Sequence, residues 1–189
     1  MNDVTGEYYL RGVMETASGF RFNADSTFDF FFSQGALDRE GSGTWKQNGS
    51  QLILNGPPRH EKDFILEKSR HTKEKQVTVQ IEDPNKVLLR YVLVGLKADT
   101  GYIQQQADES GTVKFPLQTV TEISLIHLIF PDRYSDFVIA DSTMNEFTFS
   151  IDPAIAKVYF DNLTLNVGDD GLTGSHPLLE GHEFTYEKN

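Results

Sequence analysis

The side chains that could do chemistry in this chain are few. There is no cysteine, which excludes disulfides, thiolate nucleophiles and cysteine-based metal sites. The histidines stand at positions 60, 71, 127, 176 and 182. His127 lies inside the apolar run "SLIHLIF", which indicates a buried structural histidine, because a proton-transfer role requires a carboxylate partner. His60 and His71 lie in polar surroundings and are expected to be solvated.

Known catalytic motifs are missing from the sequence. No G-x-S-x-G elbow occurs, and "HEKDF" (60–64) and "HEFTY" (182–186) each lack the second histidine of a zinc-binding helix. "GDDGLTG" (168–174) offers only Asp169 and Asp170 as neighbouring oxygen ligands, too few for a calcium cage. The sequence therefore predicts no catalytic residue, no metal ligand, no cofactor and no enzymatic activity.

Carboxylates and one arginine lie near the aromatic strands. A glycosidase needs two carboxylates across a cleft, and Glu15, Asp29, Asp38 and Glu40 are the nearest candidates, although a structural role is favoured for all four. Arg11 belongs to the strand-like "GEYYLRGV" (6–13). Inside a small barrel its guanidinium would need either a structural partner such as Glu15 or an anionic ligand, so Arg11 is a candidate ligand-binding residue.

Alternation of apolar residues with a period of two predicts the elements that carry these side chains. In "TFDFFFS" (27–33), Phe28, Phe30 and Phe32 share one face, while Phe31 faces the other way. Asn48-Gly49 predicts a hairpin between 41–47 and 50–55. The remaining strands of this first group are expected at 6–13, 19–23 and 63–67.

A second group of strands follows the polar connection "KSRHTKEK" (68–75). Seven short strands separated by turns have the number and spacing of an immunoglobulin-like sandwich. They are expected at 76–82, 87–97, 102–107, 112–117, 122–130, 136–141 and 145–151. Two further strands are expected at 157–167 and 182–188, with a turn at 168–174.

The strand count sets the domain organisation. The first group is too small to close alone, but the C-terminal strands bring it to about eight, the size of a small barrel. We therefore predict a barrel of residues 1–70 together with 155–189, and an inserted sandwich of residues 71–154. The alternative is two consecutive domains, 1–70 and 71–189.

The inward aromatic residues are the candidate site. Phe20, Phe22, Phe28, Phe30 and Phe32 either fill the barrel as its core or leave a cavity for a small apolar ligand, with Arg11 and Trp45 nearby. Phe31, with Trp45 or Tyr9, is expected to help bury the contact between the barrel and the sandwich. A filled barrel would instead indicate an interaction module with an exposed apolar patch elsewhere, for example near Tyr134 and Phe137.

Charge and composition restrict the partners. The formal net charge is −11, which disfavours nucleic acids and anionic membranes. No run has the length of about 18 apolar residues that a membrane span needs. The N-terminus "MNDVTGEYYL" has no leader pattern, so the chain is expected in the cytoplasm, or in the periplasm or outside the cell if a leader was removed.

Two stretches resemble known families. The motifs "YYLRGVMETAS", "FFSQGALD" and "GTW" resemble those of uncharacterised bacterial proteins, and the same stretch is loosely similar to lipocalins. "ADESGTVKFPL" is similar to a turn and strand of transthyretin-like and carboxypeptidase-regulatory-like sandwiches. The resemblance implies an all-β protein with a small lipocalin-like barrel and an immunoglobulin- or transthyretin-like sandwich.

Function is predicted only as a class. We expect a non-enzymatic binding protein that takes a small apolar ligand in the barrel or a protein partner. The alternatives are an interaction or structural module with a filled barrel, and a hydrolase whose site the sequence does not reveal.

Overall fold

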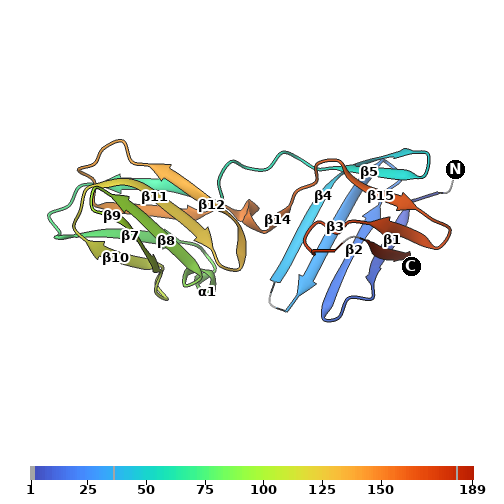
Figure 1. The fold of residues 1–189 in the computed structure, drawn as a ribbon, viewed down its shortest axis with the longest axis horizontal. Helices are drawn as coiled ribbons and strands as arrows, with labels where there is room; N and C mark the ends of the chain where they lie inside the picture. Colours follow the sequence, from blue (N-terminus) through green and yellow to red (C-terminus); the bar gives the residue numbers. More distant parts are fainter. Residues whose placement is uncertain (1–2, 36, 182) are drawn as a thin grey trace. The chain divides into compact units, whose positions relative to one another are not determined.

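The computed structural model describes residues 3–35, 37–181 and 183–189. The chain forms two compact units, drawn as ribbons in Figure 1. The first unit consists of Met1–Arg59 and Ala156–Asn189, and the second is His60–Ile155. Strands make up 59 % of the residues and helices 4 %, so the protein is all-β.

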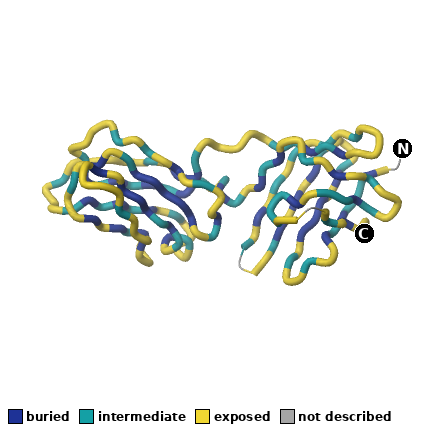
Figure 2. Tube along the Cα trace, viewed as in Figure 1, coloured by how far each residue is buried: buried dark blue, intermediate teal, exposed yellow. Residues whose placement is uncertain are grey.

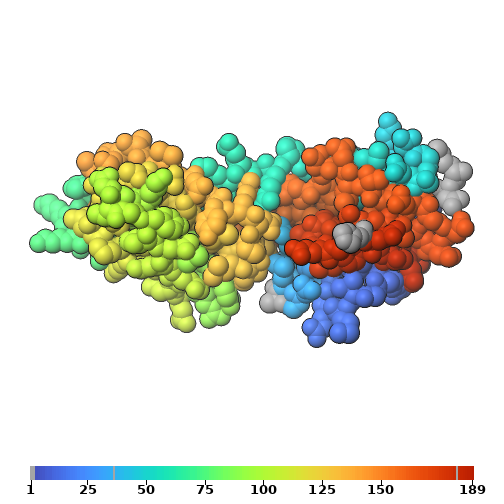
Figure 3. Space-filling view, in the orientation of Figure 1, coloured from blue at the N-terminus to red at the C-terminus, as the bar shows by residue number. Residues whose placement is uncertain are grey.

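The first unit is a closed antiparallel barrel of eight strands. The strands follow one another around it in chain order, and β17 pairs with β1 to complete the circle. They are β1 (Gly6–Arg11), β2 (Thr16–Phe22), β3 (Thr27–Gln34), β4 (Leu37–Asn48), β5 (Gln51–Asn55), β15 (Leu163–Val167), β16 (Gly171–Gly174) and β17 (Phe184–Lys188). Figure 3 shows the C-terminal residues, in red, against the N-terminal strands, in blue.

Local sequence explains the strands that build the barrel. In β3 the side chains of Phe28, Phe30 and Phe32 are buried and Phe31 is exposed, as the alternation predicts. The predicted hairpin joins β4 to β5 through Gly49 and Ser50, and Gly49 has the positive φ of +61° that such a tight loop needs.

A short strand covers one side of the barrel near β4. The 3₁₀ turn Pro153–Ala156 leads into β14 (Lys157–Val158), which pairs parallel to β4. Gly41 makes room for this segment, because a Cβ atom there would lie 2.7 Å from the ring of Phe160. The buried Arg39 donates to the carbonyl of Lys157 at 2.9 Å.

The second unit has two four-stranded sheets. The first sheet has the order β10-β7-β13-β6 and the second the order β12-β11-β8-β9, with β13 parallel to β7. The elements are β6 (Phe64–Arg70), β7 (Gln76–Glu82), α1 (Lys86–Leu89), β8 (Val92–Ala98), β9 (Gly101–Gln106), β10 (Thr112–Pro116), β11 (Val120–His127), β12 (Phe130–Val138) and β13 (Glu146–Ile151).

The core of the second unit lies between its sheets. Alternate residues such as Val79, Leu96 and Phe147 are fully buried, and the blue tube in Figure 2 marks the buried positions. The rings of Phe137 in β12 and Phe149 in β13 meet edge to face at 4.9 Å, which joins the two sheets. Burial of these apolar side chains stabilises the unit.

Several predicted elements need correction. Residues 63–67 do not belong to the first group, because β6 runs to Arg70 and pairs with β13. The predicted strand at 87–97 begins as helix α1, and the expected strand at 136–141 lies at 130–138. Part of the predicted turn at 168–174 is strand β16. Pairing between distant segments decides these assignments, and local alternation does not report it.

Among the described residues, no helix is both long enough and apolar enough to cross a membrane.

Candidate functional site

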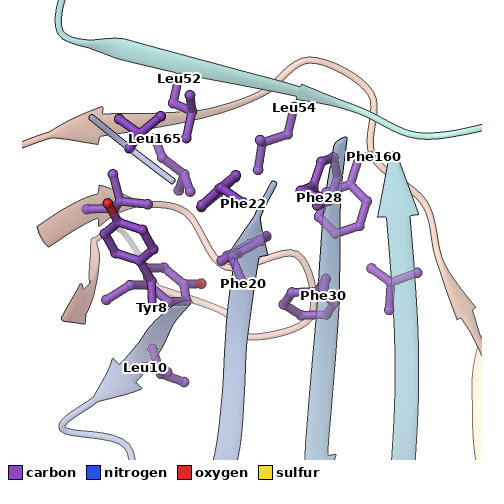
Figure 4. Close-up of a cluster of buried hydrophobic side chains, with 14 of the residues drawn as sticks. Tyr8, Leu10, Phe20, Phe22, Phe28, Phe30, Leu52, Leu54, Phe160 and Leu165 are labelled. Carbon is purple, nitrogen blue, oxygen red and sulfur yellow. The ribbon is translucent and has the colours of Figure 1, made fainter. Parts of the chain in front are cut away.

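The five predicted phenylalanines converge inside the barrel. Their side chains are 1–3 % exposed and pack against one another, as Figure 4 shows for four of them. Phe20 is central: its ring lies 4.9 Å from that of Phe30 and 5.1 Å from that of Tyr186. Phe160, which was not among the predicted residues, meets Phe28 at 4.9 Å. These contact distances are those of packed aromatic rings, so the rings fill the space that they enclose.

The other two candidate binding residues lie apart from this cluster's centre. Trp45 packs edge to face on Phe22 at 6.2 Å, and its Nε1–H donates to the carbonyl of Asn23 at 3.2 Å. Arg11 faces outward, not into the barrel, and its Nε donates to Glu187 Oε2 at 2.9 Å. The expected partner, Glu15, lies in the turn after β1 instead. The outward direction follows from the register, since Tyr8 and Leu10 take the inward positions of β1.

Of the four carboxylates considered for catalysis, Asp29 and Glu40 line one groove on the outer face of the barrel, and Glu15 and Asp38 do not line it. Asp29, Asp38 and Glu40 are exposed on outward positions of β3 and β4, and Glu15 has a φ of +55° in an exposed turn. Within the described residues, no group of three or more histidines and carboxylates is arranged to hold a metal ion.

One buried histidine and one buried serine form a polar link inside the barrel. His176 Nε2 lies 3.0 Å from Ser18 Oγ, and His176 Nδ1 accepts the backbone N–H groups of Leu178 and Leu179 at 3.0 and 3.1 Å. Because Nδ1 accepts, the proton of the neutral ring sits on Nε2 and is donated to Ser18. Ser18 Oγ in turn donates to the carbonyl of Phe31 at 2.9 Å.

This His–Ser pair cannot activate a nucleophile in the way a hydrolase requires. A general base needs a free nitrogen facing the hydroxyl, and here that nitrogen carries the proton. Burial lowers the pKa of His176 to about 4, so the ring is neutral at pH 7. Aromatic rings surround it, including Phe32 at 5.4 Å and Phe184 at 5.6 Å. The pair is therefore a structural link that fixes the segment after β16 across the barrel.

The remaining histidines are structural or exposed. His127 is 1 % exposed; its Nε2 lies 3.2 Å from the Leu88 carbonyl, and burial lowers its pKa. His60 pairs with Asp152 at 2.7 Å, and His71 Nδ1 lies 2.8 Å from the Thr143 carbonyl. His182 lies outside the described residues.

A groove on the outer face of the barrel is the best candidate site. We call it the outer groove; its volume is about 390 Å³. Its side chains come from four adjacent strands, and Phe20 and Phe30, whose rings point inward, line its base. The outer side chains are those of Glu7, Tyr9, Arg21, Asp29, Phe31 and Glu40.

Strand register explains how the aromatic part of the groove forms. Tyr9 lies opposite Gly19, and Gly19 lies opposite Phe31, so a residue without a side chain separates two rings. The rings of Tyr9 and Phe31 therefore meet above Gly19, edge to face at 6.0 Å. A Cβ atom at position 19 would come within 2.9 Å of the Phe31 ring. Phe31 stays 40 % exposed.

The polar part of the groove is mainly acidic. The Tyr9 hydroxyl donates to Glu7 Oε2 at 2.9 Å, and this hydrogen bond raises the pKa of Tyr9. Glu40 forms an ion pair with Lys157. Arg21 lies opposite both Glu7 and Asp29 in the strand register, and it makes no ion pair with any residue that the structure describes. Its guanidinium is the cation available to a ligand here.

Part of this groove was predictable from the sequence. Phe31 was expected on the outer face, with Tyr9 as a possible neighbour, but the apposition through Gly19 depends on the pairing of three strands. This fold and this groove place the protein in the class of two-unit all-β proteins with a closed barrel. No protein-family model, no curated protein and no solved structure matches the chain.

Proposed function

We propose that this protein is a non-enzymatic interaction module whose barrel presents the outer groove to a protein partner. The observation that carries the proposal is the contrast between the two faces of β3: the inward rings are 1–3 % exposed and packed, while Phe31 is 40 % exposed beside a groove. The filled interior favours a partner on the surface over a ligand inside the barrel.

The chemistry of the groove indicates what the partner presents. Tyrosine and arginine are enriched among the residues that dominate protein interfaces. Tyr9, Phe31 and Arg21 bring such side chains together, and Glu7, Asp29 and Glu40 surround them with negative charge. We therefore propose a protein segment that inserts an apolar or aromatic side chain flanked by lysine or arginine.

The architecture supports a finer proposal on fold. Eight antiparallel strands in up-and-down order are the architecture of lipocalins, and two four-stranded sheets with short turns are typical of immunoglobulin-like sandwiches. We propose on these grounds that the barrel is lipocalin-like and that the second unit is an immunoglobulin-like sandwich inserted into it.

Selection from a random displayed-peptide library tests the proposed function. We expect enriched sequences to combine an aromatic or large apolar residue with neighbouring lysine or arginine. Phe31→Ser should weaken binding of the selected peptides at least about tenfold, a loss of ~1.4 kcal/mol, and added salt should weaken it further.

The matched control is Tyr102→Ser, which changes an exposed aromatic residue in the second unit. It should leave peptide binding unchanged. Failure to enrich any sequence, or selected peptides that bind equally well to Phe31→Ser, would refute the proposal.

A further inference from the structure

The two units differ in their free sheet edges. The barrel is closed, whereas the sheets of the second unit end in four edge strands, β6, β9, β10 and β12. Unpaired edges attract further strands, and proteins usually protect them with charges, prolines or covering segments.

Three of these edges are protected. β6 carries Glu67, Lys68 and Arg70, and β10 carries Lys114 and Pro116. The segment before β6 covers β12. There Lys62 donates to the Asp136 carbonyl, and the backbone N–H of Asp63 donates to Ser135 Oγ at 2.9 Å.

β9 lacks these protections. Its sequence is "GYIQQQ", and the whole stretch from Thr100 to Ala107 carries neither a charged residue nor a proline. It pairs with β8 in unbroken register from Ala98↔Gly101 to Leu93↔Gln106, without a bulge. Five of its six residues are exposed. β9 is therefore a regular strand with one open side.

The hydrogen-bond pattern shows which backbone groups face the open side. The N–H of Ala107 donates to the Val92 carbonyl at 2.8 Å, so this pair bonds toward β8. Bonded pairs alternate along an antiparallel ladder. Ile103 and Gln105 therefore bond to β8, while the N–H and C=O groups of Tyr102, Gln104 and Gln106 point to the open edge.

The side chains of these three residues leave the edge accessible, because they fold over the sheet. The Tyr102 ring lies above Gly95, where an added Cβ atom would be 2.0 Å from its hydroxyl oxygen. Gln104 Nε2 lies 3.5 Å from the Tyr134 hydroxyl, and Gln106 Nε2 donates to the Arg90 carbonyl at 2.6 Å.

We propose that β9 pairs antiparallel with β9 of a second copy of this chain, about a two-fold axis at Gln104. Gln104 then faces Gln104 of the partner subunit, and Tyr102 faces Gln106 of the partner subunit. Each of these pairs exchanges both backbone hydrogen bonds, because all of these groups point to the open edge. The same surface serves both copies, as two-fold symmetry requires.

Charge selects a second copy as the occupant of this edge. Two chains of net charge −11 repel each other, so they approach best through a surface without charge. The stretch 100–107 is such a surface. In the proposed register no two charges oppose each other within the stretch 100–107, and Thr100 faces Asp108 of the partner subunit; just beyond it Asp99 faces Glu109 of the partner subunit, a like-charge pair that salt screens.

A single introduced thiol tests the register, because the natural chain has no cysteine. Gln104→Cys places two thiols opposite each other across the axis, within the Cα separation that a disulfide spans. We expect a disulfide-linked dimer under mild oxidation. The matched control is Lys114→Cys on edge strand β10, which should remain monomeric. Equal cross-linking of both variants, or of neither, would overturn the proposal.

Analytical ultracentrifugation tests the association itself. Gln104→Pro removes an N–H that faces the open edge and leaves the bonds to β8 intact, so it should give a folded monomer; Gln104→Lys, which places like charges opposite each other, should do the same. For the natural chain, dimer formation should strengthen from roughly 50 to 500 mM salt, because salt screens the repulsion.

Two results would contradict this assignment. One is a natural chain that stays monomeric at about 100 μM throughout the salt series. The other is a dimer that persists in both Gln104 variants. Neither result bears on the outer groove, which lies in the other unit.

Discussion

The barrel and the two-sheet unit bury their cores by different means. The barrel core is largely aromatic, with Phe20, Phe28 and Phe160 in mutual contact, whereas the second unit is filled mainly by aliphatic residues such as Val79 and Leu96. Closure pairs all eight barrel strands on both sides, and packed side chains fill the interior. The open sheets keep their edges and must protect them. The comparison shows that a closed sheet offers no strand edge to a partner, whereas an open sheet does.

The largest expected effect comes from removing the central ring of the barrel. Phe20→Ala deletes contacts with Phe22, Phe30 and Tyr186, and should lower the free energy of unfolding of the barrel by about 3–5 kcal/mol. Urea unfolding followed by Trp45 fluorescence measures it, because the only tryptophan reports on the barrel.

Phe31→Ala is the matched control on the opposite face of the same sheet. Phe31→Ala should lower the free energy of unfolding of the barrel by less than about 1 kcal/mol, because the ring is already partly exposed. Similar losses for both variants would show that the interior is not the packed core described above.

The next largest effect is the loss of barrel stability in acid, which His176 causes. The pKa of His176 falls from 6.5 to about 4 on folding, so between these values the unfolded chain binds a proton that the folded barrel does not. The barrel is fully stabilised above pH 6.5 and should lose about 3 kcal/mol as the pH falls to 4. Unfolding curves across this range, again read at Trp45, measure the loss.

His176→Gln removes the titrating group and should flatten this pH dependence. Burial also lowers the pKa of His127, so the second unit weakens in the same direction. The loss of stability of the second unit in acid should therefore persist in His176→Gln. Circular dichroism measures it, because both units contribute to this signal. A pH dependence of the barrel that is unchanged in His176→Gln would contradict the assignment.

A smaller effect has the opposite sign. The Tyr186 hydroxyl is buried and has no hydrogen-bond partner among the described residues, and burial raises the pKa of Tyr186. Tyr186→Phe should therefore stabilise the barrel by about 1 kcal/mol. A thermal melt compares it with the natural chain, and a clear loss of stability would indicate that the hydroxyl is hydrogen-bonded.

The smallest effect concerns the surface of the barrel. Arg11 and Glu187 form an ion pair although their side chains are 58 % and 53 % exposed. A double-mutant cycle with Arg11→Ala and Glu187→Ala should give a coupling energy of no more than about 0.5 kcal/mol. A coupling energy several times larger would contradict this expectation, because it would require the two side chains to be shielded from solvent, and in the barrel both are more than half exposed.

Sequence predicted what depends on neighbours along the chain. Alternation placed Phe28, Phe30 and Phe32 inside and Phe31 outside, and Asn48-Gly49 marked the hairpin between β4 and β5. It did not reveal that Arg11 faces outward, because "YYLR" is apolar or aromatic on both faces up to that residue.

What depends on distant segments was not predictable from one sequence. The assignment of β6 rests on its pairing with β13, some 80 residues later in the chain. The outer groove rests on the register of β1, β2 and β3 around Gly19, and the role of His176 rests on Ser18 across the barrel. Local patterns carry no information on such pairings.

The insertion between β5 and β15 has a consequence for how the barrel is made. During synthesis, β1 to β5 leave the ribosome as an incomplete sheet, while their closing partners lie beyond the stretch His60–Ile155. At about 5–20 residues per second, that stretch delays closure by roughly 5–20 s. The outer edges of β1 and β5 must therefore remain unpaired while a complete second unit emerges and folds, because their partners β17 and β15 follow it in the chain, and this interval is when the chain is most exposed to misassembly.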